Sequence, residues 1–214
     1  MFIFSNLATS IDGKIASNDR SFFPIGTPYD RKHMVKLRSR CDAILIGAST
    51  LRCFKKPSLA SKSQKQPINI ILSKNLDGIS FDWPFFQSSL IRRLFFVDKQ
   101  IPKNKLRHLR KFAEVYVLKK PTAKQPIAVQ IVDTLTSLGV KRLLIEGGGN
   151  VMWHFVRHHL IDEYHVTLTP KLIGGETAPT LVDGEGFATK NILSLRLHQC
   201  RRLRNELYLT YRKR

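Results

Sequence analysis

Short apolar runs alternate with amphipathic stretches along most of this chain. The apolar runs predict strands over residues 2–8, 42–46, 67–72, 94–97, 115–118, 142–145 and 163–169. Apolar positions three and four apart predict helices over residues 28–40, 103–112, 127–138 and a stretch that begins near residue 149. Two closing runs, 192–200 and 206–211, alternate and should pair antiparallel. The pattern predicts one α/β domain over residues 1–214, a three-layer sandwich with a central mixed, mostly parallel sheet and a C-terminal antiparallel hairpin.

Three consecutive glycines separate a predicted buried strand from a predicted helix. Gly147, Gly148 and Gly149 follow Glu146, the first residue after the strand. Residues without a Cβ permit positive φ and let a ligand approach the backbone, and the start of a helix favours an anion such as a pyrophosphate. A glycine-rich turn without a ligand is the alternative. Glu146 favours the ligand, because open α/β sheets bind ligands at the carboxyl ends of their strands.

Two other strand ends carry hydroxyl groups. A turn of small residues follows the strand at 42–46, where Thr50 could meet a ligand or only cap a helix. Ser73 follows the strand at 67–72, with Lys74 beside it, and could hold an adenosine 2′-phosphate or form an ordinary turn. Near the N-terminus, Asp12 and Gly13 have the chemistry of a turn before a short return strand, in which Asp12 caps its own backbone.

Less regular segments lie between these elements. Residues 21–27 read as a loop with exposed aromatic side chains, and Thr27 and Pro28 as the cap and first turn of the following helix. Residues 55–66 are polar and basic and predict a mobile loop, whereas 81–87 fit neither helix nor strand clearly.

The chain is strongly basic, with 36 Lys and Arg against 16 Asp and Glu and a net charge of +20. Such a field attracts phosphates, including those of nucleic acids. The basic residues are spread over nearly every predicted surface element without interleaved aromatic residues, which favours a generally basic surface over a nucleic-acid site.

Composition also bears on location and on metals. No apolar run approaches the ~20 residues of a membrane span, and the N-terminus has no basic leader, so we expect a cytoplasmic protein. Three cysteines without paired spacing suggest neither disulfides nor zinc. His154 and His158 are four residues apart, but no carboxylate accompanies them on that helix face, and we expect no metal site.

Four segments in order resemble one family. They are SIDGKIAS, LRSRCDAILIGASTL, LLIEGGGNVMWHFVRHHLIDEYHVTLTPKLIGG and the closing hairpin. Together they resemble the reductase domain of the bacterial riboflavin deaminase-reductase, which has a dihydrofolate-reductase-like fold. The H-x-E and P-C-x-x-C signature of the deaminase half is absent, so the chain resembles the reductase standing alone. The resemblance implies a homodimer and NADPH-dependent reduction of 5-amino-6-(5-phosphoribosylamino)uracil to the ribitylamino compound.

The resemblance also implies roles for particular residues. The cofactor pyrophosphate would lie against a glycine-rich stretch made of Gly147, Gly148, Gly149, Asn150 and Val151. Thr50 would lie near the nicotinamide half and Ser73 near the 2′-phosphate. Glu146 would be the catalytic candidate and contact the substrate, which Asp12, Ser21 and Arg38 would also bind. Arg38 offers a bidentate fork for phosphate, and a solvated helix charge is the alternative.

Some positions depart from the family pattern. Phe54 stands where the family usually has an Asp near both cofactor and substrate, and Asn6 stands where many bacterial members have Lys. The cofactor half of the site therefore matches better than the substrate half. Two alternatives follow: a reductase of another pteridine-like or carbonyl substrate, including a dihydrofolate-reductase-like activity, and a non-catalytic relative that binds polyanions.

Overall fold

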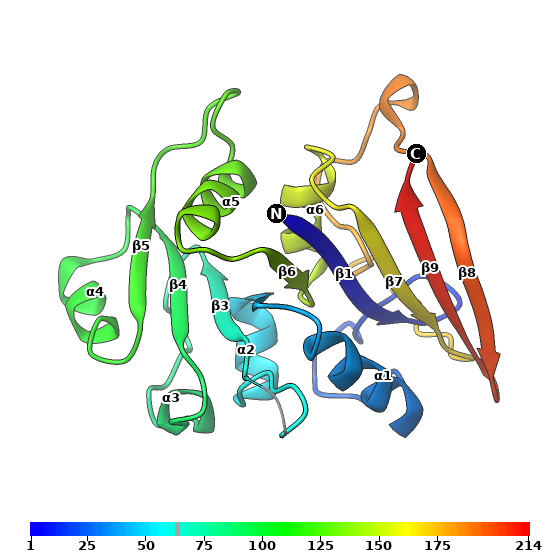
Figure 1. Ribbon diagram of the computed structural model, residues 1–214, viewed down its shortest axis with the longest axis horizontal. Coiled ribbons are helices and arrows are strands. Elements are labelled where there is room, and N and C mark those ends of the chain that lie inside the picture. The colour runs from blue at the N-terminus through cyan, green and yellow to red at the C-terminus, as the bar shows by residue number, and fades with distance from the viewer. Residues whose placement is uncertain (63–64) are drawn as a thin grey trace.

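One sheet runs through the whole computed structural model, which describes residues 1–62 and 65–214. Its nine strands in these residues are β1 (Phe2–Thr9), β2 (Ala43–Gly47), β3 (Ile68–Ser73), β4 (Arg93–Asp98), β5 (Glu114–Leu118), β6 (Arg142–Ile145), β7 (Glu163–Leu168), β8 (Leu195–Leu203) and β9 (Glu206–Lys213). They lie in the order β5-β4-β3-β2-β6-β1-β7-β9-β8 (Figure 1). Strands β1 to β7 are parallel, and β9 is antiparallel to both β7 and β8. The predicted mixed sheet with a closing hairpin is confirmed.

Helices cover both faces of the sheet. They are α1 (Pro28–Arg38), α2 (Ala48–Phe54), α3 (Pro84–Gln87), α4 (Lys103–Leu109), α5 (Ile127–Ser137) and α6 (Gly149–Val156), with a 3-10 turn at Thr189–Asn191. Helices α5 and α6 pack into one apolar cluster, and α1 to α4 pack into a second cluster on the other face. Central strands are therefore buried on both sides, and β2 is buried at every position.

Parallel pairing brings the carboxyl ends of the strands to one edge. Ser5 lies opposite Ile145 of β6, and Thr9 lies opposite Leu168 of β7. Because β2 and β3 run in the same direction, the residues that follow each of these strands meet at this edge. In Figure 1 the arrowheads of β1, β6 and β7 point toward the lower side of the molecule, where α1 and α2 lie.

The main difference from prediction is α2, which lies where the sequence predicts a turn of small residues. Gly47 is its N-cap, with extended backbone, and Leu51 is fully buried in the cluster with Leu37 of α1. Burial of Leu51 stabilises a helix whose sequence shows little periodicity. Thr50 lies inside this helix, so its interpretation as a helix cap is wrong.

The other differences between the predicted and the observed elements are smaller. The predicted return strand is wrong, since the segment makes one isolated bridge, from Lys14 to Thr180. Residues 81–87 contain the short helix α3, and β8 begins three residues later than predicted. Thr27 and Pro28 cap and start α1, as predicted. The predicted loop at 55–66 includes residues 63–64, which lie outside the described residues.

Candidate functional site

Arg38 and Glu146 form a buried ion pair at the carboxyl edge of the sheet. Arg38 is the last residue of α1, and Glu146 directly follows β6. Arg38 Nε donates to Glu146 Oε1 at 2.8 Å, and Nη2 donates to Oε2 at 2.6 Å. The two side chains are 14% and 6% exposed. Burial acts to lower the pKa of Arg38, but the charge and hydrogen bonds of Glu146 outweigh it and raise that pKa.

This pair changes the interpretation of Arg38. A solvated helix charge is wrong, because the guanidinium is buried and bound on both sides of its fork. Its remaining nitrogen, Nη1, donates to the carbonyl oxygen of Leu59 at 3.4 Å. The fork expected for a phosphate is thus directed at a carboxylate, and Arg38 fixes the position of Glu146.

The three glycines of the turn are required for three different reasons. A Cβ on Gly147 would lie 2.8 Å from Ile46 Cα, so its absence lets the turn pack against β2. A Cβ on Gly149 would lie 2.5 Å from the carbonyl oxygen of Thr180. Gly148 has φ +62 and ψ 137, a conformation that only glycine adopts readily, and no atom lies within 4 Å of a Cβ built there.

Gly148 therefore leaves open space at the start of a helix. It is the N-cap of α6, and no side chain caps that end. The positive end of the helix dipole and this space fit an anionic group such as a pyrophosphate. Asn150 is exposed beside it, whereas the side chain of Val151 is buried in the core and packs near Gly47. Only the backbone of Val151 is therefore available to a cofactor.

One hydroxyl candidate lies in the helix that follows β2 and the other at the end of β3. Thr50 is half-buried in α2, and Ser73 is buried at the end of β3, where its hydroxyl donates to the carbonyl of Asn75. Arg52 connects α2 to the loop after β3, since it donates to the Ser49 hydroxyl at 3.0 Å and to the carbonyl of Asp77 at 3.2 Å. The sequence drew no attention to Arg52, which is one of 36 basic residues.

A cavity of about 450 Å³ lies next to the loop that follows β3. Its lining residues come from that loop and from α4: Leu76, Asp77, Gly78, Ile79, Phe81, Asn104, Lys105 and His108. Phe81 and His108 meet edge to face with ring centres 4.5 Å apart, and Lys105 pairs with Asp77 at 2.8 Å. The cavity combines an aromatic wall with an ammonium group and a carboxylate that pair with each other. No pattern in the sequence pointed to this cavity, because residues 81–87 fit no clear element.

Asp12 and Ser21 occupy loops at the same end of the molecule. Asp12 accepts hydrogen bonds from the N–H groups of Ile173 and Gly174, at 3.1 and 2.6 Å, and so ties its turn to the loop after β7. A hydrogen bond from Ser10, followed by those from Gly174 and Ile173, lowers the pKa of Asp12 to about 2. Ser21 is exposed, and its hydroxyl and N–H group donate to Asp19.

Sequence reasoning missed a layer of polar side chains between α1 and the sheet. Its buried members are Asn6, Glu163, His165, Thr167, Glu206 and Thr210. Glu206 accepts from the Thr27 N–H group and hydroxyl, at 2.8 and 2.7 Å, and from the Tyr208 hydroxyl at 2.7 Å. The available signal was the alternation of polar residues on the strands near the C-terminus, which placed these side chains on one face.

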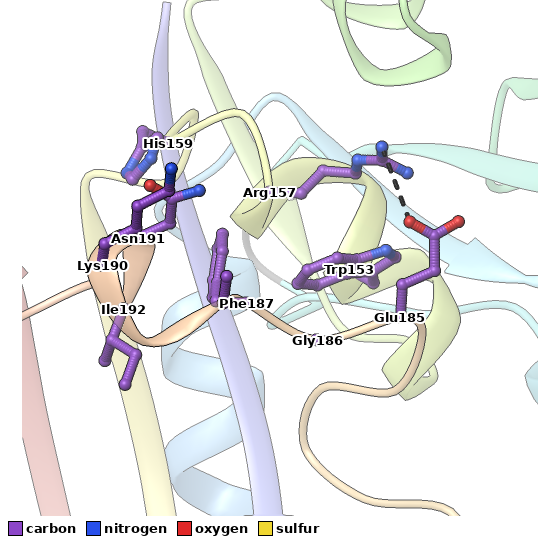
Figure 2. A pocket seen from close by; sticks show the side chains of 10 residues that line it. Trp153, Arg157, His159, Glu185, Gly186, Phe187, Lys190, Asn191 and Ile192 are labelled. Carbon is purple, nitrogen blue, oxygen red and sulfur yellow. Dashed lines mark ion pairs between the residues drawn. The ribbon is translucent and has the colours of Figure 1, made fainter.

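A second cavity lies at the other end of α6. Figure 2 shows this pocket of about 510 Å³, with Trp153 and Phe187 between Arg157 on one side and Lys190 on the other. Arg157 faces Glu185 at 4.0 Å across an exposed ion pair. Trp153, which lines this pocket, is four residues after Gly149, so the pocket begins about 6 Å along α6 from the open space at Gly148.

Residues 1–62 and 65–214 contain no cluster of three or more His, Cys, Asp or Glu side chains arranged to hold a metal ion. In the same residues, no helix has the length and apolar character needed to cross a membrane.

Comparison with known proteins gives a consistent result. The chain is 29% identical over 200 residues to the 2,5-diamino-6-ribosylamino-4(3H)-pyrimidinone 5′-phosphate reductase of Archaeoglobus fulgidus, which covers 88% of this chain and 89% of that protein. It is 30% identical to the riboflavin biosynthesis protein RibD of Synechocystis, over 84% of this chain but only 48% of that protein. It likewise spans 57% of the solved chain of Acinetobacter baumannii RibD.

The fold and the family follow from two further matches. A pyrimidine reductase-like protein from Corynebacterium diphtheriae superposes with a TM-score of 0.82 at 23% identity, covering 99% of this chain and 91% of that one. At this identity the likeness shows the fold. The family model described as the RibD C-terminal domain matches residues 1–209, nearly the whole chain. The protein belongs to the RibD C-terminal domain family.

Proposed function

We propose that this protein reduces the phosphoribosylamino group of a riboflavin-pathway pyrimidine to a ribitylamino group, using NADPH. The observation that carries the proposal is the carboxyl end of β6. There Glu146, fixed by Arg38, directly precedes a glycine turn whose middle residue leaves open space at a helix N-terminus. The family implies a reduced nicotinamide cofactor, and its relatives carry the names of reductases.

The cofactor would extend from the glycine turn toward β3. Its pyrophosphate would lie at Gly148, Gly149 and Asn150, where backbone N–H groups and the α6 dipole favour negative charge. Strands β6, β2 and β3 are neighbours, so the end of β3 lies about 10 Å from the turn at ~4.8 Å per strand. That distance suits the adenosine half, with Ser73 and Arg52 near the 2′-phosphate. The cavity beside Phe81 would then take the base.

The substrate would lie toward β1 and β7, with Thr50 near the nicotinamide half of the cofactor. Glu146 would contact the ribose hydroxyl groups, because its carboxylate is held rigidly at the strand end. Asp12 and Ser21 would contribute through the loops that border this region. A hydride from the reduced nicotinamide is what the cofactor supplies when bound.

Two pyrimidines are candidate substrates, and they differ at C2 of the ring. The Archaeoglobus relative is named for a 2,5-diamino-pyrimidinone phosphate, and it matches this chain over 89% of its length. The family resemblance implies instead the uracil compound, 5-amino-6-(5-phosphoribosylamino)uracil. We propose the diamino compound as the preferred substrate, because that relative matches this chain along nearly its whole length.

A different substrate is the second candidate, and one observation favours it. Phe54, at the position of the family Asp, is 53% exposed and packs edge to face against Phe22, with ring centres 5.3 Å apart. An apolar pair thus replaces a carboxylate. Lys55 does not restore charge there, since its ammonium lies 5.7 Å from the centre of the Trp83 ring in the direction of α3.

The test is oxidation of NADPH by the purified protein with each pyrimidine in turn, and with NADH as the control cofactor. Oxidation that depends on either pyrimidine supports the proposal, and the ratio of kcat/KM identifies the preferred one. Tight NADPH binding without turnover of either pyrimidine would redirect the search to pteridine-like and carbonyl substrates. Binding of generic DNA or RNA without NADPH binding would favour a polyanion-binding relative. The homodimer stays a prediction, which the mass in solution tests.

A further inference from the structure

Asp30 turns its carboxyl group from the first turn of α1 toward the sheet. Its side chain is half-buried and lies near the Thr167 hydroxyl on β7. A Cβ on Gly26 would lie 2.5 Å from Asp30 Cγ, so the absence of a side chain at Gly26 makes room for this carboxyl group. Asp30 thus lies between its own helix, β7 and the loop before α1.

The charged and titratable groups that act on Asp30 come from several neighbouring elements. Glu146 lies after β6, Glu206 and Tyr208 lie on β9, and Lys171 lies after β7. Lys171 donates to the carbonyl of Ile25 and so is held in the same region. The site therefore presents three carboxyl groups and one ammonium group around the end of β7.

These three carboxyl groups have different partners. Glu146 has the guanidinium of Arg38, and Glu206 has three donors from Thr27 and Tyr208. Asp30 lies near a neutral group, the hydroxyl of Thr167. Burial, followed by the neighbouring charges of Glu206 and Glu146, raises the pKa of Asp30, although the start of a helix ordinarily favours the anion. Asp30 is therefore the carboxyl group of the three best suited to carry a proton.

A buried acceptor nearby points to a ligand at this place. Asn6 is 7% exposed, and its Oδ1 atom has no hydrogen-bond partner in the described part of the chain. In the sheet, Asn6 lies opposite His165 of β7, which is two residues from Thr167 and on the same face. Because Ser5 lies opposite Ile145 of β6, Asn6 also lies next to Glu146. Phe4, on the same face of β1, packs in the cluster with α1. An N–H group of an aminopyrimidine would satisfy Asn6 and bring the ligand beside Asp30.

We propose that Asp30 is the proton donor of the reduction, an inference that rests on the proposed function. As the ribose ring opens, the bond from C1 to the ring oxygen breaks, and the exocyclic nitrogen forms a double bond to C1. The ring oxygen takes the proton of Asp30, which becomes a carboxylate. A hydride then adds to C1, the electrons of the double bond return to nitrogen, and Asp30 regains a proton from water. One hydride and one proton enter the product, so the step is balanced.

The experiment compares Asp30→Asn with the wild-type protein across pH, with Asp133→Asn as control. Asp133 is an exposed acid on α5, which packs on the opposite face of the sheet from α1. Asp30→Asn should lower kcat by about 100-fold while the Kd for NADPH stays within about twofold. The wild-type rate should fall as pH rises through the pKa of Asp30, because the acid form is needed, and the variant should lose this limb. Asp30→Glu should restore part of kcat.

A direct titration separates this role from a structural one. With ¹³C-labelled aspartate, NMR should show one carboxyl group in the wild-type protein that titrates above the ordinary Asp range, and Asp30→Asn should lack that signal. A kcat within about threefold of wild type, an unchanged pH limb or an unchanged set of titrating carboxyl groups would overturn the inference. In each case wild-type turnover would leave the proposed function standing. Absence of wild-type turnover with either pyrimidine would contradict the proposed function and this inference together.

Discussion

Arg38 donates to both carboxylate oxygens of Glu146, although 108 residues separate the two in the chain. The pair joins the end of α1 to the end of β6, and both side chains are largely removed from water. Removal of either partner would leave a buried charge uncompensated. The pair thus serves two purposes in this fold: it connects a helix to the central strand, and it holds one carboxylate in a set position beside the glycine turn.

Arg38→Ala should therefore destabilise the protein by about 3–5 kcal/mol. Urea unfolding measures this change. The exposed pair of Arg92 and Glu114, 45% and 44% exposed, provides the control, and Arg92→Ala should cost less than about 1 kcal/mol. The double variant of Arg38→Ala and Glu146→Ala should cost less than the sum of the single changes. Additive costs would show that the two side chains are not coupled.

Glu146→Gln should impair turnover more than cofactor binding. The amide keeps the shape but loses the charge that faces the substrate, and we expect kcat/KM to fall about 100-fold while the Kd for NADPH stays within about twofold. Steady-state kinetics and fluorescence titration measure the two quantities, and circular dichroism checks the fold. Unchanged turnover would mean that Glu146 is only the structural partner of Arg38.

Gly148→Ala should weaken NADPH binding at least tenfold. A methyl group would enter the open space at the N-terminus of α6 and strain a backbone with φ +62. Gly139→Ala is the matched control, because Gly139 also has positive φ, +79, with nothing within 4 Å, and lies after α5. Both variants should lose stability, but only Gly148→Ala should lose cofactor affinity. Equal affinities in the two folded variants would show that the turn is only structural.

Ser73→Ala should reduce the preference for NADPH over NADH. One hydrogen bond to a charged phosphate contributes about 1.5–3 kcal/mol, which corresponds to a preference lowered about 10- to 100-fold. The measurement is kcat/KM with each cofactor. Arg52→Ala should act in the same direction, because Arg52 borders the same loop. If Ser73→Ala leaves the preference unchanged, the bond from its hydroxyl to Asn75 is its whole role.

His33 should make the protein less stable in acid. Burial, followed by the charge of His165, lowers the pKa of His33 to about 4 from an ordinary value of 6.5. Between these values the unfolded chain binds more protons than the folded one, so the free energy of unfolding falls as pH decreases through this window. Since His33 is partly exposed, we expect a loss of about 1–2 kcal/mol.

Urea unfolding at pH 7 and pH 4.5 tests this expectation for wild type and His33→Phe. The phenylalanine ring keeps the edge-to-face contact with Tyr208, whose ring centre lies 5.2 Å away. Acidification from pH 7 to pH 4.5 should lower the free energy of unfolding of the variant less than that of the wild-type protein. Equal losses in the two proteins would assign the acid sensitivity to other groups.

Local features of the chain were predictable because they depend on near neighbours. The apolar run of β2 indicated a strand buried on both faces. Thr27 and Pro28 indicated the start of α1, and the three glycines indicated a turn after β6. Helix α2 was not predictable in this way, since its stability depends on Leu51 packing against residues of other elements. The chemistry of Glu146 was recognisable, but its partner was not.

By itself, then, the sequence determined the alternation of strands and helices, the closing hairpin, the family and the position of the glycine turn. The tertiary structure decided which side chains lie together: Arg38 pairs with Glu146, Asp30 lies near Thr167, and the buried Asn6 Oδ1 atom has no hydrogen-bond partner among the described residues. The physical reason is that hydrophobic periodicity and turn chemistry act over a few residues, whereas pKa shifts and ion pairs depend on burial and on charges brought together from distant parts of the chain.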